Sequence, residues 1–198
     1  MKKYLSISLM ALIPTVALAE TAPVPEVFQP HAYLDATIGA AKAVDGCDGI
    51  GNDECDDTDT GVRLAFGYQM NQQGFFELGY IDFGETTYDF SNSFDVEDAT
   101  AKAAVTALYG VGGVNIPVEY VEFFGKAGFA LAKVEITADS TSIDGRSFSP
   151  IISGGIHIPV AKHFGLVAQM DYLLNAGDED ETGQSDMFMV SAGARLSF

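Results

Sequence analysis

The residues best suited to catalysis in this sequence are its three histidines, His31, His157 and His163. A hydrolytic site would pair such a base with a nucleophile, for example the serine of a Gly-x-Ser-x-Gly turn. The sequence holds neither that turn motif nor a His-x-Ser pair. These residue types therefore predict a protein that is not an enzyme and that carries no cofactor.

The two cysteines, Cys47 and Cys55, lie close together in the acidic stretch 45–57. A Cys-x-x-Cys redox motif or a zinc site would need a different spacing or more ligands, so we expect a disulfide. The stretch also resembles the Asp- and Gly-rich loops that hold calcium in extracellular proteins. Because it lacks the ligand spacing of an EF-hand, we expect weak binding of divalent cations at acidic loops and no defined metal site.

The composition excludes several classes of function. The chain has 198 residues, 28 acidic and 10 basic side chains, and a net charge of −18. Nucleic-acid binding needs clustered Lys and Arg, which this chain lacks, so we expect no nucleic-acid partner. Hydrophobic residues make up 47% of the chain, which is too much for a disordered protein, and the length suits a single domain.

The N-terminal residues 1–19 have the features of a cleaved signal peptide. Lys2 and Lys3 precede an apolar run over 5–13, and the small residues Ala17 and Ala19 mark a cleavage site before Glu20. The apolar run is too short for a spanning helix, which needs about 20 residues. We expect residues 20–30 to form a short periplasmic leader before the folded part, 31–198.

The rest of the chain alternates between apolar residues and small or polar ones. Phe188, Val190 and Ala192 alternate with Met189, Ser191 and Gly193, for example. A period of two indicates β-strands that have one apolar face. Eight such segments can be placed, at 31–43, 60–70, 74–88, 101–116, 120–137, 147–160, 163–175 and 186–198; the pattern leaves the register of the fourth open.

The connections between these segments alternate in length. Those near 71–73, 115–119 and 159–163 are short, whereas those near 44–59, 85–99, 138–146 and 176–185 are long and acidic. This layout predicts an all-β fold, an eight-stranded antiparallel up-and-down transmembrane β-barrel with short periplasmic turns and long extracellular loops. A soluble secreted barrel is the main alternative. It would carry many Lys and Glu residues on its outer face, whereas the non-apolar face here is rich in Gly, Ala and Ser, as a narrow lumen requires.

Several motifs resemble those of OmpA-type and OmpX-type small outer-membrane barrels. They are the stretch 65–84 (AFGYQMNQQGFFELGYIDFG), Gly125 to Gly128, Ser149-Pro150 followed by Gly154-Gly155, and Met170 to Tyr172. The end of the chain, Leu196 and Phe198, resembles the family's C-terminal signal, which implies the outer-membrane insertion machinery as a partner. The resemblance implies an integral protein of a Gram-negative outer membrane, with the barrel domain alone and no peptidoglycan-binding domain.

The apolar alternation also predicts which side chains face the lumen. The expected inward polar set comprises Asp35, Thr37, Arg63, Gln69, Glu77, Glu122, Lys126, His157, Gln169, Asp171 and Arg195. Its acids and bases nearly balance, which is what burial demands because an unpaired buried charge is costly. By resemblance Glu77 and Lys126 occupy positions of a lumenal ion-pair network, whereas His157 and Gln169 depart from the family's pattern.

These observations predict a monomeric outer-membrane barrel whose lumen is plugged by side chains. Its role would be envelope structure or surface interaction, such as adhesion or resistance, with membrane lipid and lipopolysaccharide as its surroundings. Two other functions stay open: a small diffusion channel gated by the lumenal network, and an enzyme that modifies lipid A. Conductance across a planar bilayer would distinguish the first, and mass spectra of lipid A the second.

Overall fold

The computed structural model describes residues 28–44, 46–47, 55–89, 100–138, 141–178 and 182–198. The expected signal peptide and most of the expected leader lie outside these ranges. All regular structure in the described part of the chain is β-strand. None of it forms a helix long and apolar enough to cross a membrane.

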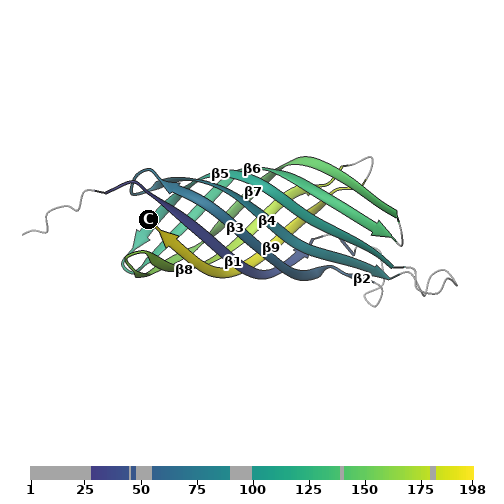
Figure 1. The fold of residues 1–198 in the computed structure, drawn as a ribbon, viewed down its shortest axis with the longest axis horizontal. Coiled ribbons are helices and arrows are strands. Elements are labelled where there is room, and N and C mark those ends of the chain that lie inside the picture. Colours follow the sequence, from purple (N-terminus) through teal and green to yellow (C-terminus); the bar gives the residue numbers. More distant parts are fainter. Residues whose placement is uncertain (1–27, 45, 48–54, 90–99, 139–140, 179–181) are drawn as a thin grey trace, which may run out of the picture.

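Among the described residues, eight long strands and one very short strand make up the fold, and Figure 1 shows their arrangement. They are β1 (His31–Ala43), β2 (Cys55–Asp56), β3 (Thr58–Gln69), β4 (Gly74–Asp89), β5 (Thr100–Val118), β6 (Val121–Ala138), β7 (Thr141–Ala161), β8 (Phe164–Ala176) and β9 (Ser185–Ser197). The long strands correspond to the eight segments that the alternation predicts. The added element, β2, is a two-residue strand paired with β4.

The eight long strands close into a ring, with every pair antiparallel. Strands that follow one another along the chain are hydrogen-bonded, and the ring closes where β1 pairs with β9. Figure 1 shows the strands tilted steeply around one long axis, as closure of a barrel requires. The predicted fold class, an antiparallel up-and-down barrel, is confirmed.

Each long strand has one face turned inward and one turned outward. On β3, Val62, Leu64 and Phe66 are exposed, while Arg63 and Ala65 between them are buried. The strand β5, whose register the sequence left open, follows the same rule. Val105, Ala107, Tyr109 and Val111 on it are buried, and Leu108 is exposed. An apolar surface thus faces the outside of the ring. The inside holds both polar side chains and a cluster of buried apolar ones, which includes Ile81, Phe83 and Leu173.

The two ends of the barrel differ. At the short-turn end, three tight connections join β3 to β4, β5 to β6 and β7 to β8. The first is shaped by Asn71, whose Oδ1 accepts hydrogen bonds from the backbone N–H groups of Gln73 (2.9 Å) and Gly74 (2.7 Å). The chain ends at this same end of the barrel, which is marked C in Figure 1. The opposite end, where the longer connections lie, is called the long-loop end below.

One expected loop, 138–146, is in large part a strand. The β6–β7 ladder continues past the expected limit to the pair Ala138 and Thr141, so most of this segment is a β-hairpin arm. Glu135 and Asp144 are register partners on that arm. The sequence predicted a loop here because Ile143 is the only large apolar residue among the Ser, Thr, Asp and Gly residues of 141–147, so no apolar alternation is visible.

Candidate functional site

The inward faces of six strands bring most of the expected polar set together. Asp35 and Asp171 are 0% and 1% exposed, Glu77 1%, and Arg63, Lys126 and Arg195 no more than 5%. Each is flanked by outward-facing neighbours, so the period-two backbone alone sends these side chains into the interior. There the ring of strands excludes them from the surrounding solvent.

Glu77 on β4 is the centre of this interior cluster. Its carboxylate accepts a hydrogen bond from Arg63 Nη2 on β3 and from Lys126 Nζ on β6, the latter at 2.7 Å. Two tyrosines also donate to it, Tyr109 Oη from β5 at 2.9 Å and Tyr33 Oη from β1 at 3.2 Å. One carboxylate therefore ties together side chains of five strands.

Asp35 and Arg195 form a second ion pair beside the first. Arg195 donates from Nε and Nη2 to the two carboxylate oxygens of Asp35, each at 2.8 Å. This is the bidentate arrangement that makes Arg–carboxylate pairs strong and directional. The Arg195 guanidinium also lies over the ring of Tyr33, 3.9 Å from its centroid. Arg63 Nη1 is 4.0 Å from Asp35 and so connects the two ion pairs.

Asp171 extends the cluster toward β7 and β8. It accepts hydrogen bonds from Ser153 Oγ and from Gln169 Nε2, both at 2.6 Å. The Oε1 atom of Gln169 in turn accepts a hydrogen bond from Lys126 Nζ at 3.3 Å. The network is continuous, except that Arg63 Nε and Nη1 have no hydrogen-bond partner among the described residues.

Thr37 is also buried in the interior, and its Oγ1 accepts a hydrogen bond from Ser191 Oγ at 3.1 Å. The other members of the expected set, Gln69, Glu122 and His157, lie apart, near the short-turn end. His157 Nδ1 is 2.8 Å from Glu122 Oε2, and the Glu122 side chain is 37% exposed, so this pair sits at the mouth of the lumen. Gln69 contacts Asn115 at 2.9 Å. All three histidines line a cavity of about 640 Å³ that opens at this mouth. No hydrogen bond or ion pair between described residues links these groups directly to Glu77.

Sequence reasoning did not identify several residues of the network. Tyr33 and Tyr109 were missed because aromatic residues in a membrane barrel are expected to face lipid. Tyr109 also lies on the strand whose register was open. A signal was available in Gly67 and Gly79, because a Cβ at either position would overlap the Tyr33 or Tyr109 ring. Glycines on an inward face can thus mark places where a large side chain fills the lumen.

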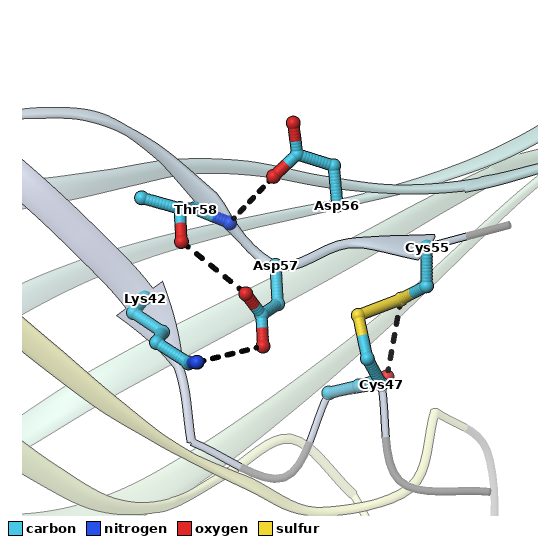
Figure 2. Close-up of a disulfide and its surroundings, with 7 residues drawn as sticks. Lys42, Cys47, Cys55, Asp56, Asp57 and Thr58 are labelled. Carbon is cyan, nitrogen blue, oxygen red and sulfur yellow. Dashed lines mark hydrogen bonds and ion pairs between the residues drawn. A yellow bond between two sulfur atoms is a disulfide. The ribbon is translucent and has the colours of Figure 1, made fainter. Parts of the chain in front are cut away.

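The expected disulfide is present and shapes the long-loop end (Figure 2). Cys47 and Cys55 are bonded, with their Cα atoms 5.7 Å apart. Cys55 belongs to β2, which pairs with Tyr88 and Thr87 of β4. Next to it Asp57 accepts a hydrogen bond from Thr58 Oγ1 at 3.2 Å and pairs with Lys42 Nζ at 3.2 Å. The disulfide therefore joins the segment just after β1 to β2 at the rim of the barrel.

Asp59 organises the same rim. Its carboxylate accepts hydrogen bonds from the backbone N–H groups of Glu85, at 2.8 Å, and Thr60, at 2.6 Å. These donors, with that of Glu85 first in importance, hold the pKa of Asp59 below its usual value. Glu85 follows a β-bulge at Gly84, which has a φ of 77° that favours glycine.

The described residues offer little for other kinds of chemistry. No group of three His, Cys, Asp or Glu side chains in the described ranges could hold a metal ion. Four of the acids expected in the first loop, Asp45, Asp48, Asp53 and Glu54, lie outside those ranges. Leu196 and Phe198, expected as an insertion signal, are exposed on the outer face, and Phe198 N donates to Ala32 O at 2.9 Å.

Comparison with known proteins identifies the family. Residues 29–198 match the OmpA-like transmembrane domain. Neisserial surface protein A has a similar structure, with a TM-score of 0.56 and 14% identity over 85% of this chain and 97% of that one. The N-terminal barrel domain of Pseudomonas aeruginosa OprF gives a TM-score of 0.49 and 12% identity, over 86% of this chain and 100% of that domain. Yersinia pestis Ail, in complex with the heparin analogue sucrose octasulfate, gives a TM-score of 0.48 and 16% identity, over 84% of this chain and 97% of that one.

No curated protein matches the chain. At these identities the solved structures speak for the fold alone, whereas the family match spans most of the sequence. A β protein that spans a membrane must also be a closed ring with an apolar outer face. An open strand edge in lipid would leave its backbone N–H and C=O groups without hydrogen-bond partners. The chain therefore belongs to the OmpA-like transmembrane domain family, as an integral, multi-pass β-barrel of the outer membrane.

Proposed function

We propose that the lumen of this barrel is closed by its own side chains and that the protein serves envelope structure and surface interaction. The observation that carries the first part is the cluster around Glu77. Its partners Tyr33, Arg63, Tyr109 and Lys126 come from β1, β3, β5 and β6, so they reach across the interior. An eight-stranded barrel is only just wide enough for such side chains to fill.

The second part rests on charge at the long-loop end, which we assign to the cell exterior because outer-membrane barrels carry their longer loops there. Many acids of the described residues gather at this end: Asp56, Asp57, Asp59, Glu85, Glu135, Asp144, Asp178 and Asp186. A rim of this kind favours cationic partners and divalent cations through long-range attraction. It suits a surface that meets ions, neighbouring cells or host molecules.

The test of a closed lumen is conductance across a planar lipid bilayer. The refolded wild-type barrel is expected to add no stepwise current to that of the lipid alone. Lys126→Ala removes a long, buried side chain bonded to Glu77 and is expected to open a measurable path. Lys102→Gln is the matched control, because Lys102 is exposed and pairs with Glu85 outside the lumen.

A small diffusion channel is the second candidate, and one observation favours it. Arg63 Nε and Nη1 are buried without hydrogen-bond partners among the described residues, and buried polar groups usually have a protein or water partner. Water next to Arg63, continuous with the cavity at the mouth, would make a conducting path. Stepwise wild-type conductance that changes in Glu77 and Lys126 variants but not in Lys102→Gln would establish the channel and refute the closed lumen.

We infer that the protein is not a lipid-A-modifying enzyme. Its histidines His31, His157 and His163 all line the cavity at the short-turn end. With the loops assigned to the exterior, that end faces the periplasm, a full barrel length from lipid in the outer leaflet. Mass spectra of lipid A from cells with and without the protein are expected to be identical.

A further inference from the structure

The basic residues of the barrel fall into two main groups, one inside the lumen and one on the outer face near the long-loop end. Arg63, Lys126 and Arg195 are buried in the lumen, and Lys162 lies in a turn at the short-turn end. The other basic residues of the described chain project outward near the long-loop end: Lys42, Lys102, Lys133 and Arg146. In a protein with a large acid excess, every outward-facing base of the long strands is thus found near the external surface of the membrane.

Two of these four bases are direct neighbours. Lys133 on β6 and Arg146 on β7 are register partners, and both lie on the outer face of the sheet. Like charges directly opposite each other on neighbouring strands are destabilising. Such a pair is expected where an anion lies against both side chains and offsets the repulsion.

The two bases differ in how they are neutralised within the chain. Lys133 Nζ is 2.7 Å from Glu135 Oε2 on its own strand. The Arg146 guanidinium has no ion pair or hydrogen bond with any residue that the structure describes. It is therefore available to a ligand, and its planar donors match the oxygens of a phosphate group.

The level of this pair in the membrane follows from its neighbours. Leu131 and Phe148, two residues closer to the middle of the barrel on the same strands, are also register partners. They are 62% and 67% exposed, and the Phe148 ring stacks on that of Phe129 with centroids 4.8 Å apart. The outer face changes at this point from apolar to charged, which marks the boundary between acyl chains and headgroups.

We propose that Lys133 and Arg146 form a binding site for a phosphate group of an outer-leaflet lipid. Arg146 donates two N–H groups to the phosphate oxygens, and Lys133 contributes a third contact from the neighbouring strand. The acyl chains of the same lipid lie against Leu131, Phe148 and Phe129. This continuity with the apolar surface favours a lipid-borne phosphate over a free one. The site depends on the place of the barrel in the membrane and not on whether its lumen conducts.

Two carboxylates lie near this site and limit its strength. Glu135 and Asp144 are register partners one step farther from the membrane than the bases. A phosphate at headgroup level meets Lys133 and Arg146 first, and the acids lie beyond it. Because Glu135 competes for Lys133, its removal is expected to strengthen phosphate binding.

The test measures binding of bisphosphorylated lipid A and of the same lipid A stripped of its phosphates. The refolded chain is studied in detergent micelles with a chelator present, so that divalent cations do not bridge acids and phosphates. The wild type is expected to bind the phosphorylated lipid at least about tenfold more tightly than the stripped lipid. Arg146→Gln is expected to lose most of this preference, and Glu135→Gln to increase it.

The matched control is again Lys102→Gln, which removes an exposed base at the same end of the barrel without touching the Lys133–Arg146 pair. A loss in this control as large as that in Arg146→Gln would mean nonspecific charge attraction and would overturn the site. So would equal affinity for the two lipids. Displacement of lipid A by inorganic phosphate at equal concentration would show a site for free phosphate, which also contradicts the proposal. Heat-modifiable migration on a detergent gel verifies that each variant is folded.

Discussion

Lys126 and Glu77 lie 49 positions apart in the chain, and Lys126 Nζ is 2.7 Å from Glu77 Oε1. They belong to β6 and β4, with β5 between them, so they meet inside the ring and not along the sheet. Both side chains are almost completely buried. Each charge in such a place depends on the other, because the interior offers little solvent to replace a lost partner.

Replacing Glu77 by Gln is expected to destabilise the barrel strongly. The change leaves Arg63 and Lys126 as two buried cations that have lost their shared anion, which costs about 3–5 kcal/mol in comparable sites. Urea unfolding in lipid vesicles, followed by circular dichroism and by the folded band on a gel, measures this loss. A change smaller than about 1 kcal/mol would contradict the central role of Glu77.

A second substitution is expected to relieve part of that loss. Lys126→Met removes one of the two stranded cations and keeps an unbranched side chain of similar length. The Glu77→Gln/Lys126→Met double variant is therefore expected to be less destabilised than the sum of the single variants. Strict additivity would show that the two residues do not act as a pair, whatever the size of either single effect.

Alanine in place of Gly67 or Gly79 is expected to destabilise the barrel by about 1–3 kcal/mol, because the added Cβ would overlap the ring of Tyr33 or Tyr109. Gly125→Ala is the matched control on another strand, since no heavy atom lies within 4 Å of a Cβ there. The control is expected to be neutral or slightly stabilising in the same urea experiment. Equal effects at the three positions would show that strand propensity alone is responsible.

Loss of the disulfide is expected to act locally. The link joins residues only 8 positions apart, between the end of β1 and β2, and so constrains none of the pairings between the long strands. The double variant Cys47→Ser/Cys55→Ser should therefore loosen β2 from β4 and leave the ring intact. Hydrogen exchange measures this, with faster exchange at Tyr88 and Thr87 and unchanged exchange at Leu78 and Tyr80. Faster exchange throughout the ring would assign the disulfide a global role.

The Asp59 contacts predict a pH effect at the rim. Its pKa is lowered in the folded protein by hydrogen bonds from the Glu85 and Thr60 N–H groups. The contacts therefore stabilise the fold above the usual Asp pKa and are lost as pH falls through the lowered value. NMR is expected to show both amide protons shifting together, with a midpoint below that of an exposed Asp. The shifts should vanish in Asp59→Asn.

The alternation of residues was enough to predict the barrel, because each strand of a membrane barrel must turn apolar side chains to lipid on every second position. That requirement is local, so it can be read from neighbouring residues such as Leu64, Phe66 and the buried Arg63 between them. The inward positions of Asp35, Glu77, Lys126 and Arg195 follow from the same rule. The Cys47–Cys55 link could also be predicted, because the two cysteines are close in sequence.

Only the tertiary structure decided which inward groups meet. Glu77 could have paired with any inward base, and its contacts with Lys126, Arg63, Tyr109 and Tyr33 depend on the tilt and register of five strands. The separation of the His157–Glu122 pair from that cluster has the same origin. The pairing of Lys133 with Arg146 on the outer face also depends on the register of neighbouring strands. Closure of the ring fixes the register of each strand relative to the next, and this register cannot be read from a short stretch of sequence.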